Sequence, residues 1–165
     1  MTAVLGCSPG TRAFAIAILI DNVLVDWDVL SFHGPWSKNK LSGILKRFET
    51  LLHTYEIQEV AIKIPDIFPT SINYNQLIGA LNILLERKGM LVHYFTFSEL
   101  KAHCDSNGKD AKECITNYVL HRHSELYTHI KSGRNLPNDR HFKVFEATCA
   151  AILLKYKRSN EAQSK

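Results

Sequence analysis

The sequence predicts an α/β fold in which helices cover both faces of a mixed five-stranded sheet. Two observations support this prediction. Three apolar segments separated by tight turns occupy the first 32 residues, and β-rich runs then alternate with segments of helical periodicity. A hairpin meander pairs antiparallel, whereas strands separated by helices pair in parallel through right-handed crossovers. A chain of 165 residues is long enough for one core, so we expect one domain over residues 1–158 and a polar tail over 159–165.

The predicted strands are short and bounded by turn signals. They are residues 3–8, 13–20, 23–32, 59–64 and 90–97. A Pro-Gly pair separates the first two strands, and Asp21-Asn22 separates the second and third, as is typical of hairpins. The strand at 59–64 follows a helix, so we expect it to pair in parallel with the strand at 3–8.

The predicted helices are recognised by apolar residues at helical spacing and by their ends. They are residues 41–55, 71–89, 98–103 and 108–123, a short one near 124–130, and a last one from about 141 to 157. Ser71 is a suitable N-cap and Gly89 a suitable stop. Pro65 and Pro69 indicate an irregular loop, and residues 133–140 are polar and predict another.

Composition and hydropathy favour a globular domain over a membrane or secreted protein. The hydrophobic fraction of 45 % and charged fraction of 22 % are those of a globular domain. No apolar run is long enough to span a membrane and no secretory leader precedes the first strand, so we expect a cytoplasmic protein without a membrane partner. The four cysteines are scattered through regular elements, which favours reduced thiols over a disulfide frame.

Five strings in the chain, in this order, resemble the RuvC-type Holliday junction resolvases of the ribonuclease H-like superfamily. They are "VLGCSPGTR", "VAIKIP", "NQLIGALNILLERKGMLVHYFTFSELKAH", "GKDAKECITNYV" and "KVFEATCAAIL". The resemblance covers nearly the whole chain and implies a ribonuclease H-like mixed sheet. It also implies branched DNA as a partner and makes a homodimer an expectation.

The resemblance implies a different site from the one that the sequence contains. Members of the superfamily hold two divalent ions with about four carboxylates, which activate a water for phosphodiester cleavage. The matching positions here are Ser8, Lys63, Lys143 and Glu146, of which only Glu146 is acidic. Lys143 and Glu146 are three residues apart and share a helical face. We expect Lys63, Lys143 or both to pair with Glu146; otherwise both lysines extend into solvent.

These substitutions predict a pseudonuclease that acts by binding nucleic acid or protein, with no catalytic residues, no metal site and no cofactor. Ser8 lacks a neighbouring base and is expected to cap a turn rather than act as a nucleophile. The alternative is an active, Mg²⁺-dependent endodeoxyribonuclease with a rearranged site. Such a site would draw on other acids, namely Asp26, Asp28, Asp66 and Asp139. A third hypothesis is that the protein is an interaction domain that binds no nucleic acid.

Candidate nucleic-acid contacts are one aromatic residue and the basic end of the chain. Phe68 follows the fourth strand, where it could stack on a base. The net charge of the chain is +4, and the last eleven residues supply four basic residues against one acidic residue. Lys155, Lys157 and Arg158 are therefore the expected electrostatic contacts. The histidines of "HRHSELYTH", and His141, are expected to lie at the surface, because their spacing fits no zinc helix.

Overall fold

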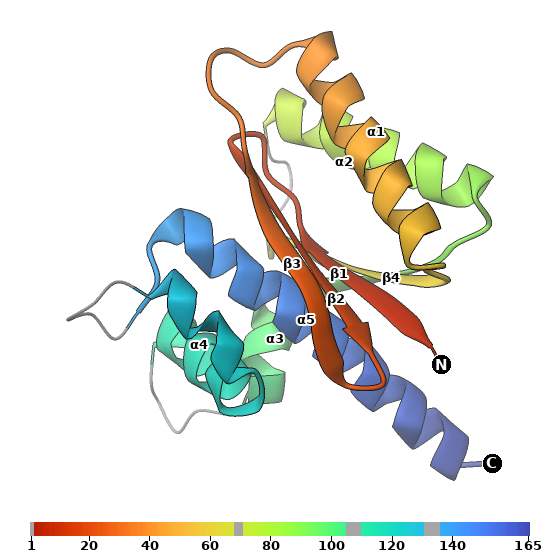
Figure 1. The fold of residues 1–165 in the computed structure, drawn as a ribbon, viewed down its shortest axis with the longest axis vertical. Coiled ribbons are helices and arrows are strands. Elements are labelled where there is room, and N and C mark those ends of the chain that lie inside the picture. The colour runs from red at the N-terminus through yellow and green to blue at the C-terminus, as the bar shows by residue number, and fades with distance from the viewer. Residues whose placement is uncertain (1, 68–70, 105–109, 131–135) are drawn as a thin grey trace.

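The computed structural model describes residues 2–67, 71–104, 110–130 and 136–165 (Figure 1). Its strands are β1 (Ala3–Ser8), β2 (Ala13–Ile20), β3 (Val23–Ser31), β4 (Glu59–Ile64) and β5 (Leu91–Thr96). Its helices are α1 (Lys38–Thr54), α2 (Ile72–Arg87), α3 (Phe97–Cys104), α4 (Ala111–Arg122), the 3₁₀ helix η1 (Ser124–His129) and α5 (Asp139–Gln163). The predicted element order is therefore confirmed.

The five strands form one mixed sheet with the order β3-β2-β1-β4-β5. β1, β2 and β3 are antiparallel neighbours, whereas β4 pairs in parallel with both β1 and β5. The α/β class, the five strands and the parallel pairing of β4 with β1 are as predicted. This topology places the carboxyl ends of β1 and β4 side by side, since parallel neighbours run in the same direction.

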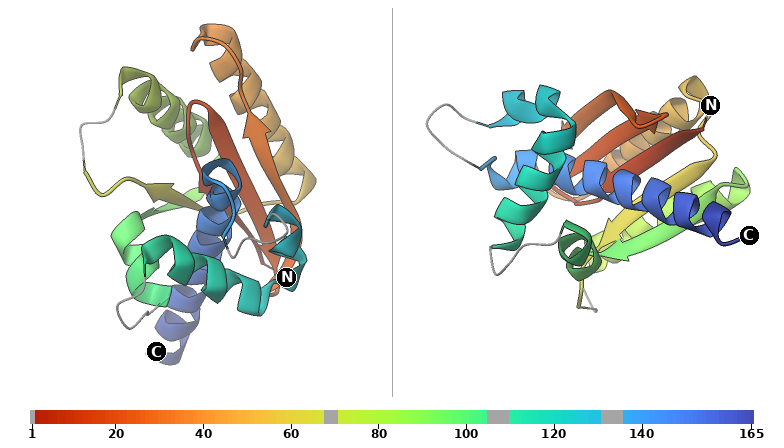
Figure 2. Two further views of the ribbon diagram at one scale, coloured as in Figure 1. Left: turned by 90° about the vertical axis from the view of Figure 1, so that its left-hand side faces the viewer. Right: turned by 90° about the horizontal axis from the view of Figure 1, so that it is seen from below.

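Helices cover both faces of the sheet, as Figures 1 and 2 show. α1 and α2 pack on one face over a core that includes Leu5, Phe14, Ile62 and Leu81. α3, α4 and α5 pack on the other face. Alternate residues of each buried strand thus face different helical layers, as the pleat of a strand requires.

α5 lies unusually close to the middle of the sheet because small residues line both surfaces. A Cβ atom placed on Gly6 of β1 would lie 2.0 Å from the carbonyl oxygen of Ala147 and 2.9 Å from Cβ of Ala151. Ala15 and Ala17 of β2 belong to the same buried cluster. α5 runs antiparallel to β1, since Ser8 contacts Glu146 near the start of the helix and Thr2 accepts a hydrogen bond from Lys155 near its end.

The helix boundaries differ from the predictions mainly at α5. Asn138 caps this helix by accepting a hydrogen bond from the backbone N–H of His141, and the helix continues to Gln163. Residues 159–163, predicted as tail, are therefore a helical extension whose side chains are exposed. Asp139 and Arg140, predicted as loop, form the first helical turn. The Ser71 cap is as predicted, since its hydroxyl accepts from the N–H of Tyr74.

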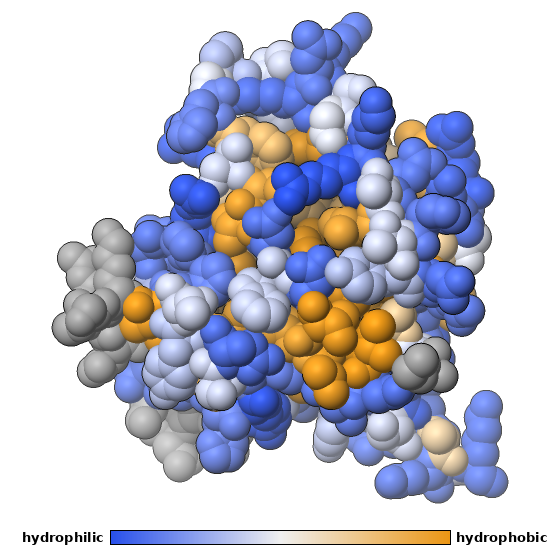
Figure 3. Space-filling view, in the orientation of Figure 1, coloured by the Kyte–Doolittle hydropathy of each residue, from blue (hydrophilic) through white to orange (hydrophobic). Residues whose placement is uncertain are grey.

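The surface that carries β3 is partly apolar. Figure 3 shows an apolar area over the β2–β3 hairpin, where Val23 is 60 % and Val25 41 % exposed. No helix in the described parts of the chain has the length and apolar character needed to cross a membrane.

Candidate nucleic-acid site

Three side chains from distant parts of the sequence meet at the carboxyl ends of β1 and β4. Ser8, the last residue of β1, donates a hydrogen bond from its hydroxyl to Oε1 of Glu146 at 3.2 Å. Lys63 Nζ lies 2.8 Å from the other carboxylate oxygen, Oε2. The Glu146 side chain is 6 % exposed and that of Lys63 is 18 % exposed. Both oxygens of a largely buried carboxylate are therefore engaged.

The position of Ser8 corrects the expectation that it caps a turn. Its side chain faces α5 and is buried, with the hydroxyl directed at Glu146. The carboxylate that accepts from this hydroxyl is itself paired with Lys63 through its other oxygen, so it is not free to act as the base that a serine nucleophile needs. Ser8 instead supplies one of the hydrogen bonds that a buried carboxylate needs.

Lys143 lies beside the same site and forms no ion pair with any residue that the structure describes. Its side chain crosses the β1–β2 turn so closely that a Cβ on Gly10 would lie 3.0 Å from Nζ. Burial lowers the pKa of Lys143, and the Lys63 ammonium lowers it further, while Glu146 acts in the opposite direction. Lys143 is thus partly buried beside a second positive charge, neither paired with Glu146 nor extended freely into solvent.

Two aromatic residues complete the walls of the site. The Lys63 ammonium lies 5.6 Å from the centroid of the Phe97 ring, at the start of α3. Tyr74, in the first turn of α2, is partly buried. Burial, with smaller effects from Cys7 and Glu146, raises its pKa. Sequence reasoning missed both residues, because only the crossing of β4, α2 and α3 brings them near Glu146.

The acids proposed for a rearranged site are engaged elsewhere. Asp66 accepts hydrogen bonds from the backbone N–H and the hydroxyl of Ser98, which lower its pKa. Asp139 is paired with Lys112, on α4. The two acids of β3 face α1, where Asp28 pairs with Arg47 and Asp26 accepts from the hydroxyl of Tyr55. Asp66 lies near enough to Lys63 for the ammonium group to add slightly to the lowering of its pKa.

The residues present do not fit the two divalent ions that the resemblance implies. Mg²⁺ prefers carboxylate and water oxygens, but here a single carboxylate is engaged by a hydroxyl and an ammonium group. A second ammonium, on Lys143, adds repulsion for any cation. Within the described residues, no three His, Cys, Asp or Glu side chains are placed to hold a metal ion.

The histidines contradict the expectation of a surface cluster. His121 is exposed, but His123 is buried. His129 accepts a hydrogen bond at Nε2 from the indole N–H of Trp27 at 2.9 Å, and its Nδ1 lies 2.6 Å from Nδ1 of His141. These rings link η1 to β3 and α5, because the 3₁₀ helix folds back over the edge of the sheet.

The other predicted contacts do not lie at this site. Phe68 is outside the described residues. Lys155 and Arg158 lie near the amino ends of β1 and β4, where they contact Thr2 and Glu59. Lys157 extends instead toward Phe95 of β5, which pairs with Lys63 in the sheet. Arg158 pairs with Glu59 at 2.9 Å, and Lys157 Nζ lies 4.9 Å from the Phe95 ring centroid. Their binding of nucleic acid stays a prediction.

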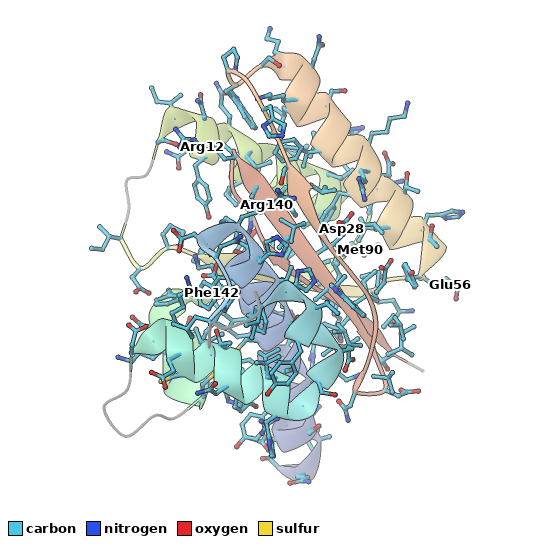
Figure 4. The ribbon with its side chains drawn as sticks, turned by 60° about the vertical axis from the view of Figure 1, so that its left-hand side comes forward. Arg12, Asp28, Glu56, Met90, Arg140 and Phe142 are labelled. Atoms are coloured by element: carbon cyan, nitrogen blue, oxygen red, sulfur yellow. The ribbon has the colours of Figure 1, made fainter. Side chains whose placement is uncertain are left out.

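Two exposed arginines lie at the same end of the sheet as Ser8. Arg12 follows the β1–β2 turn, and Arg140 occupies the first turn of α5, as labelled in Figure 4. Arg140, Lys143 and Glu146 are spaced by three residues and so share one helical face. This three-residue spacing could have identified Arg140 from the sequence. Arg140 was missed because the helix was predicted to start at residue 141.

Comparisons with known proteins agree with this architecture. The family model described as "Crossover junction endodeoxyribonuclease RuvC" matches residues 4–131. The structure of Thermus thermophilus RuvC in complex with a Holliday junction substrate is similar, with 18 % identity, a TM-score of 0.76 and 97 % of each chain covered. Another structure of Thermus thermophilus RuvC gives 17 % identity and a TM-score of 0.72, covering 96 % of this chain and 97 % of that one.

A viral protein shares the fold as well. The fowlpox virus resolvase, in complex with Holliday junction DNA, gives 13 % identity and a TM-score of 0.60, with 96 % of this chain and 98 % of that chain covered. No curated protein matches the chain in sequence. These structural likenesses show the ribonuclease H-like fold, and the family model spans well over half of the sequence. The chain therefore belongs to the RuvC family.

Proposed function

We propose that this protein binds branched DNA, such as a four-way junction, and does not cleave it. The observation that carries the proposal is the Lys63–Glu146 ion pair of 2.8 Å, with Ser8 on the second carboxylate oxygen. Metal-assisted hydrolysis needs carboxylates free to hold the ions, and the one carboxylate at the expected place is already engaged. DNA binding is supported by the fold shared with two proteins whose structures contain Holliday junctions.

The test separates binding from cleavage. A labelled four-way junction and a linear duplex of the same length are titrated with the protein in a salt series, first with chelator and then with Mg²⁺ or Mn²⁺. We expect selective, salt-dependent binding of the junction, since phosphate contacts release counterions. The strands should remain uncut in both metals. Cleavage that disappears in the Glu146→Gln variant would overturn the proposal.

The competing function is metal-dependent cleavage by a rearranged site. It is favoured by membership of a family of endodeoxyribonucleases and by Asp66, whose pKa the nearby Lys63 ammonium helps to lower. In that case Mg²⁺ must raise the melting temperature, and Asp66→Asn must abolish nicking. A third outcome, no binding to any DNA at low salt, would leave an interaction domain. A homodimer is a further prediction, which light scattering of the purified protein tests.

A further inference from the structure

Lys143 presents a positive charge that the described residues leave without an acceptor. Its ammonium group, on α5, has no hydrogen-bond acceptor or ion-pair partner within range in those parts of the chain. The single carboxylate nearby is engaged by Lys63 and Ser8. Burying a charge without a partner is costly, and a lysine at the surface ordinarily extends its ammonium into water.

The surroundings favour an anion at this point. Lys63 and Lys143 bring two positive charges to a site that holds one glutamate. Asp66, the other acid nearby, accepts two hydrogen bonds from Ser98 and so is held against α3. The exposed Arg12 and Arg140, labelled in Figure 4, lie at the same end of the sheet. Lys143 itself is only partly buried, so solvent reaches part of this group of cations.

The backbone permits a close approach. Gly10 has no side chain, and any Cβ there would lie 3.0 Å from Lys143 Nζ and 2.5 Å from the carbonyl oxygen of Ala13. The absent side chain therefore gives the lysine room to lie across the β1–β2 turn with its ammonium at the mouth of the site. Such an ammonium binds phosphate as a point charge.

We propose that Lys143, supported by Lys63, binds a backbone phosphate of DNA directly, so that ammonium groups occupy the place of metal ions. Lys143 would contact the phosphate oxygens, and Lys63 would add its charge from behind while remaining paired with Glu146. Lys143 is thus a binding residue and Lys63 a positioning residue. This inference rests on the proposed function, since it names the part of the DNA that the same site holds.

The first experiment measures binding of the four-way junction by fluorescence anisotropy over a salt series. Lys143→Gln should weaken binding several-fold, and the slope of log K against log salt should fall by about 1. Lys143→Arg should retain most of the affinity. Lys46→Gln, an exposed lysine on α1 in the opposite layer, is the matched control for loss of one charge. It should change neither the affinity nor the slope appreciably.

The second experiment uses inorganic phosphate, which distinguishes a free anion from DNA. Phosphate should raise the melting temperature of the wild type more than chloride does at equal ionic strength. The rise should be absent in Lys143→Gln. This measurement does not depend on DNA, so it also shows whether the variant is folded and whether the site accepts an anion.

The outcomes separate this inference from the proposed function. If the wild type binds the junction and Lys143→Gln binds it with the same affinity and salt slope, the inference is overturned and the proposed function is left intact. No DNA binding by the wild type would overturn the proposed function. A phosphate effect that persists without DNA binding would then replace the DNA assignment with a free phosphate. Loss of affinity in Lys143→Arg as severe as in Lys143→Gln would indicate a packing role and would also overturn the inference.

Discussion

At the scale of single residues, the site is a mutually dependent group of charges. Glu146 is buried and needs both the Lys63 ammonium and the Ser8 hydroxyl, because an unpaired carboxylate in the interior is costly. Lys63 in turn needs Glu146, since Lys143 repels it. Ser8, Lys63 and Glu146 thus stabilise the folded state through their contacts with one another.

Reversing the charge of Lys63 should destabilise the protein strongly. Lys63→Glu removes the partner of Glu146 and adds a like charge, so the free energy of unfolding should fall by about 3–5 kcal/mol. Chemical denaturation of the variant measures it. The matched control is Lys88→Glu, which breaks the exposed Lys88–Glu49 pair of 2.6 Å and should cost much less, because solvent screens an exposed pair. Equal losses in the two variants would show that the buried pair contributes no more than a surface one.

Restoring the family's acids should restore metal binding. Ser8→Asp, Lys63→Glu and Lys143→Asp together would place carboxylates around Glu146, which is the ligand type that Mg²⁺ prefers. We expect the melting temperature of the triple variant to rise with Mg²⁺ concentration, as linkage requires for a ligand of the folded state. The wild type provides the control. If the variant is folded but does not respond to Mg²⁺, the four positions do not form one metal site.

At the scale of elements, the position of α5 decides the site. The helix can place Glu146 between β1 and β4 only because Gly6 and the alanines at the interface let the two backbones approach. The helix and η1 are also joined to β3 through the hydrogen-bonded rings of Trp27, His129 and His141.

Adding one methyl group at this contact should separate helix and sheet. In Gly6→Ala the new Cβ would meet the carbonyl oxygen of Ala147 at 2.0 Å, and backbone atoms cannot move aside cheaply. Overpacking costs about 1–3 kcal/mol, and we expect the upper end of this range in thermal unfolding. Gly43→Ala, in α1 where no atom lies within 4 Å of a new Cβ, should instead stabilise by about 0.5–1 kcal/mol. If Gly6→Ala is as stable as the wild type, α5 and β1 are not packed as closely as the structure shows.

The histidine link should make the protein sensitive to acid. Burial and His141 lower the pKa of His129, while Asp28 opposes the shift. Its Nε2 accepts from Trp27, so a second proton would break that bond. A histidine whose pKa is lower in the folded state than in the unfolded state stabilises the fold at any pH above the unfolded-state pKa of about 6.5. This stabilisation is lost as the pH falls from there through the lower pKa of the folded state. The melting temperature should therefore fall between about pH 7 and 5.

The variant His129→Gln tests this assignment. The glutamine oxygen can still accept from Trp27, but the side chain does not titrate. The fall in melting temperature with acid should become shallower. It should not vanish, because burial also lowers the pKa values of His103 and His123, which still contribute to the acid sensitivity. His53→Gln on the exposed surface of α1 should leave the pH profile unchanged. An equally steep profile in His129→Gln would exclude His129 as a source of the acid sensitivity.

At the scale of the whole molecule, basic residues gather at both ends of the sheet. One group, Arg12, Arg140 and Lys143, surrounds the carboxyl ends of β1 and β4. The other group is carried by the end of α5: Lys155 and Arg158 lie near the opposite ends of these strands, and Lys157 extends toward Phe95 of β5. Arg158 already pairs with Glu59, so part of the second group is used within the fold.

A comparison of the two groups shows which end binds DNA. We expect the paired substitution Arg140→Gln and Lys143→Gln to weaken junction binding and to reduce the salt slope by about 2, since each phosphate contact contributes about one unit. Lys155→Gln with Lys157→Gln removes the same charge from the far end and should have a smaller effect. Anisotropy in a salt series measures both. A larger loss from the second pair would place the DNA at the end of α5.

Local patterns in the sequence were enough to predict the elements and their pairing. Apolar periodicity located every strand and helix, Ser71 and Gly89 marked the ends of α2, and the order of elements implied the sheet. These features depend on near neighbours, so local propensities are enough to predict them. The correspondence of Ser8, Lys63, Lys143 and Glu146 with the family's acidic positions was inferred from the order of the strings and stays a prediction.

The contacts that these positions make could not be predicted from local patterns. Ser8 and Glu146 are 138 residues apart, and whether Lys63 or Lys143 takes the carboxylate depends on how α5 crosses β4. The same holds for His129, whose surface or buried position depends on the fold of η1 against β3. Charge pairing and burial are set by distances between segments far apart in sequence, and no local pattern contains that information.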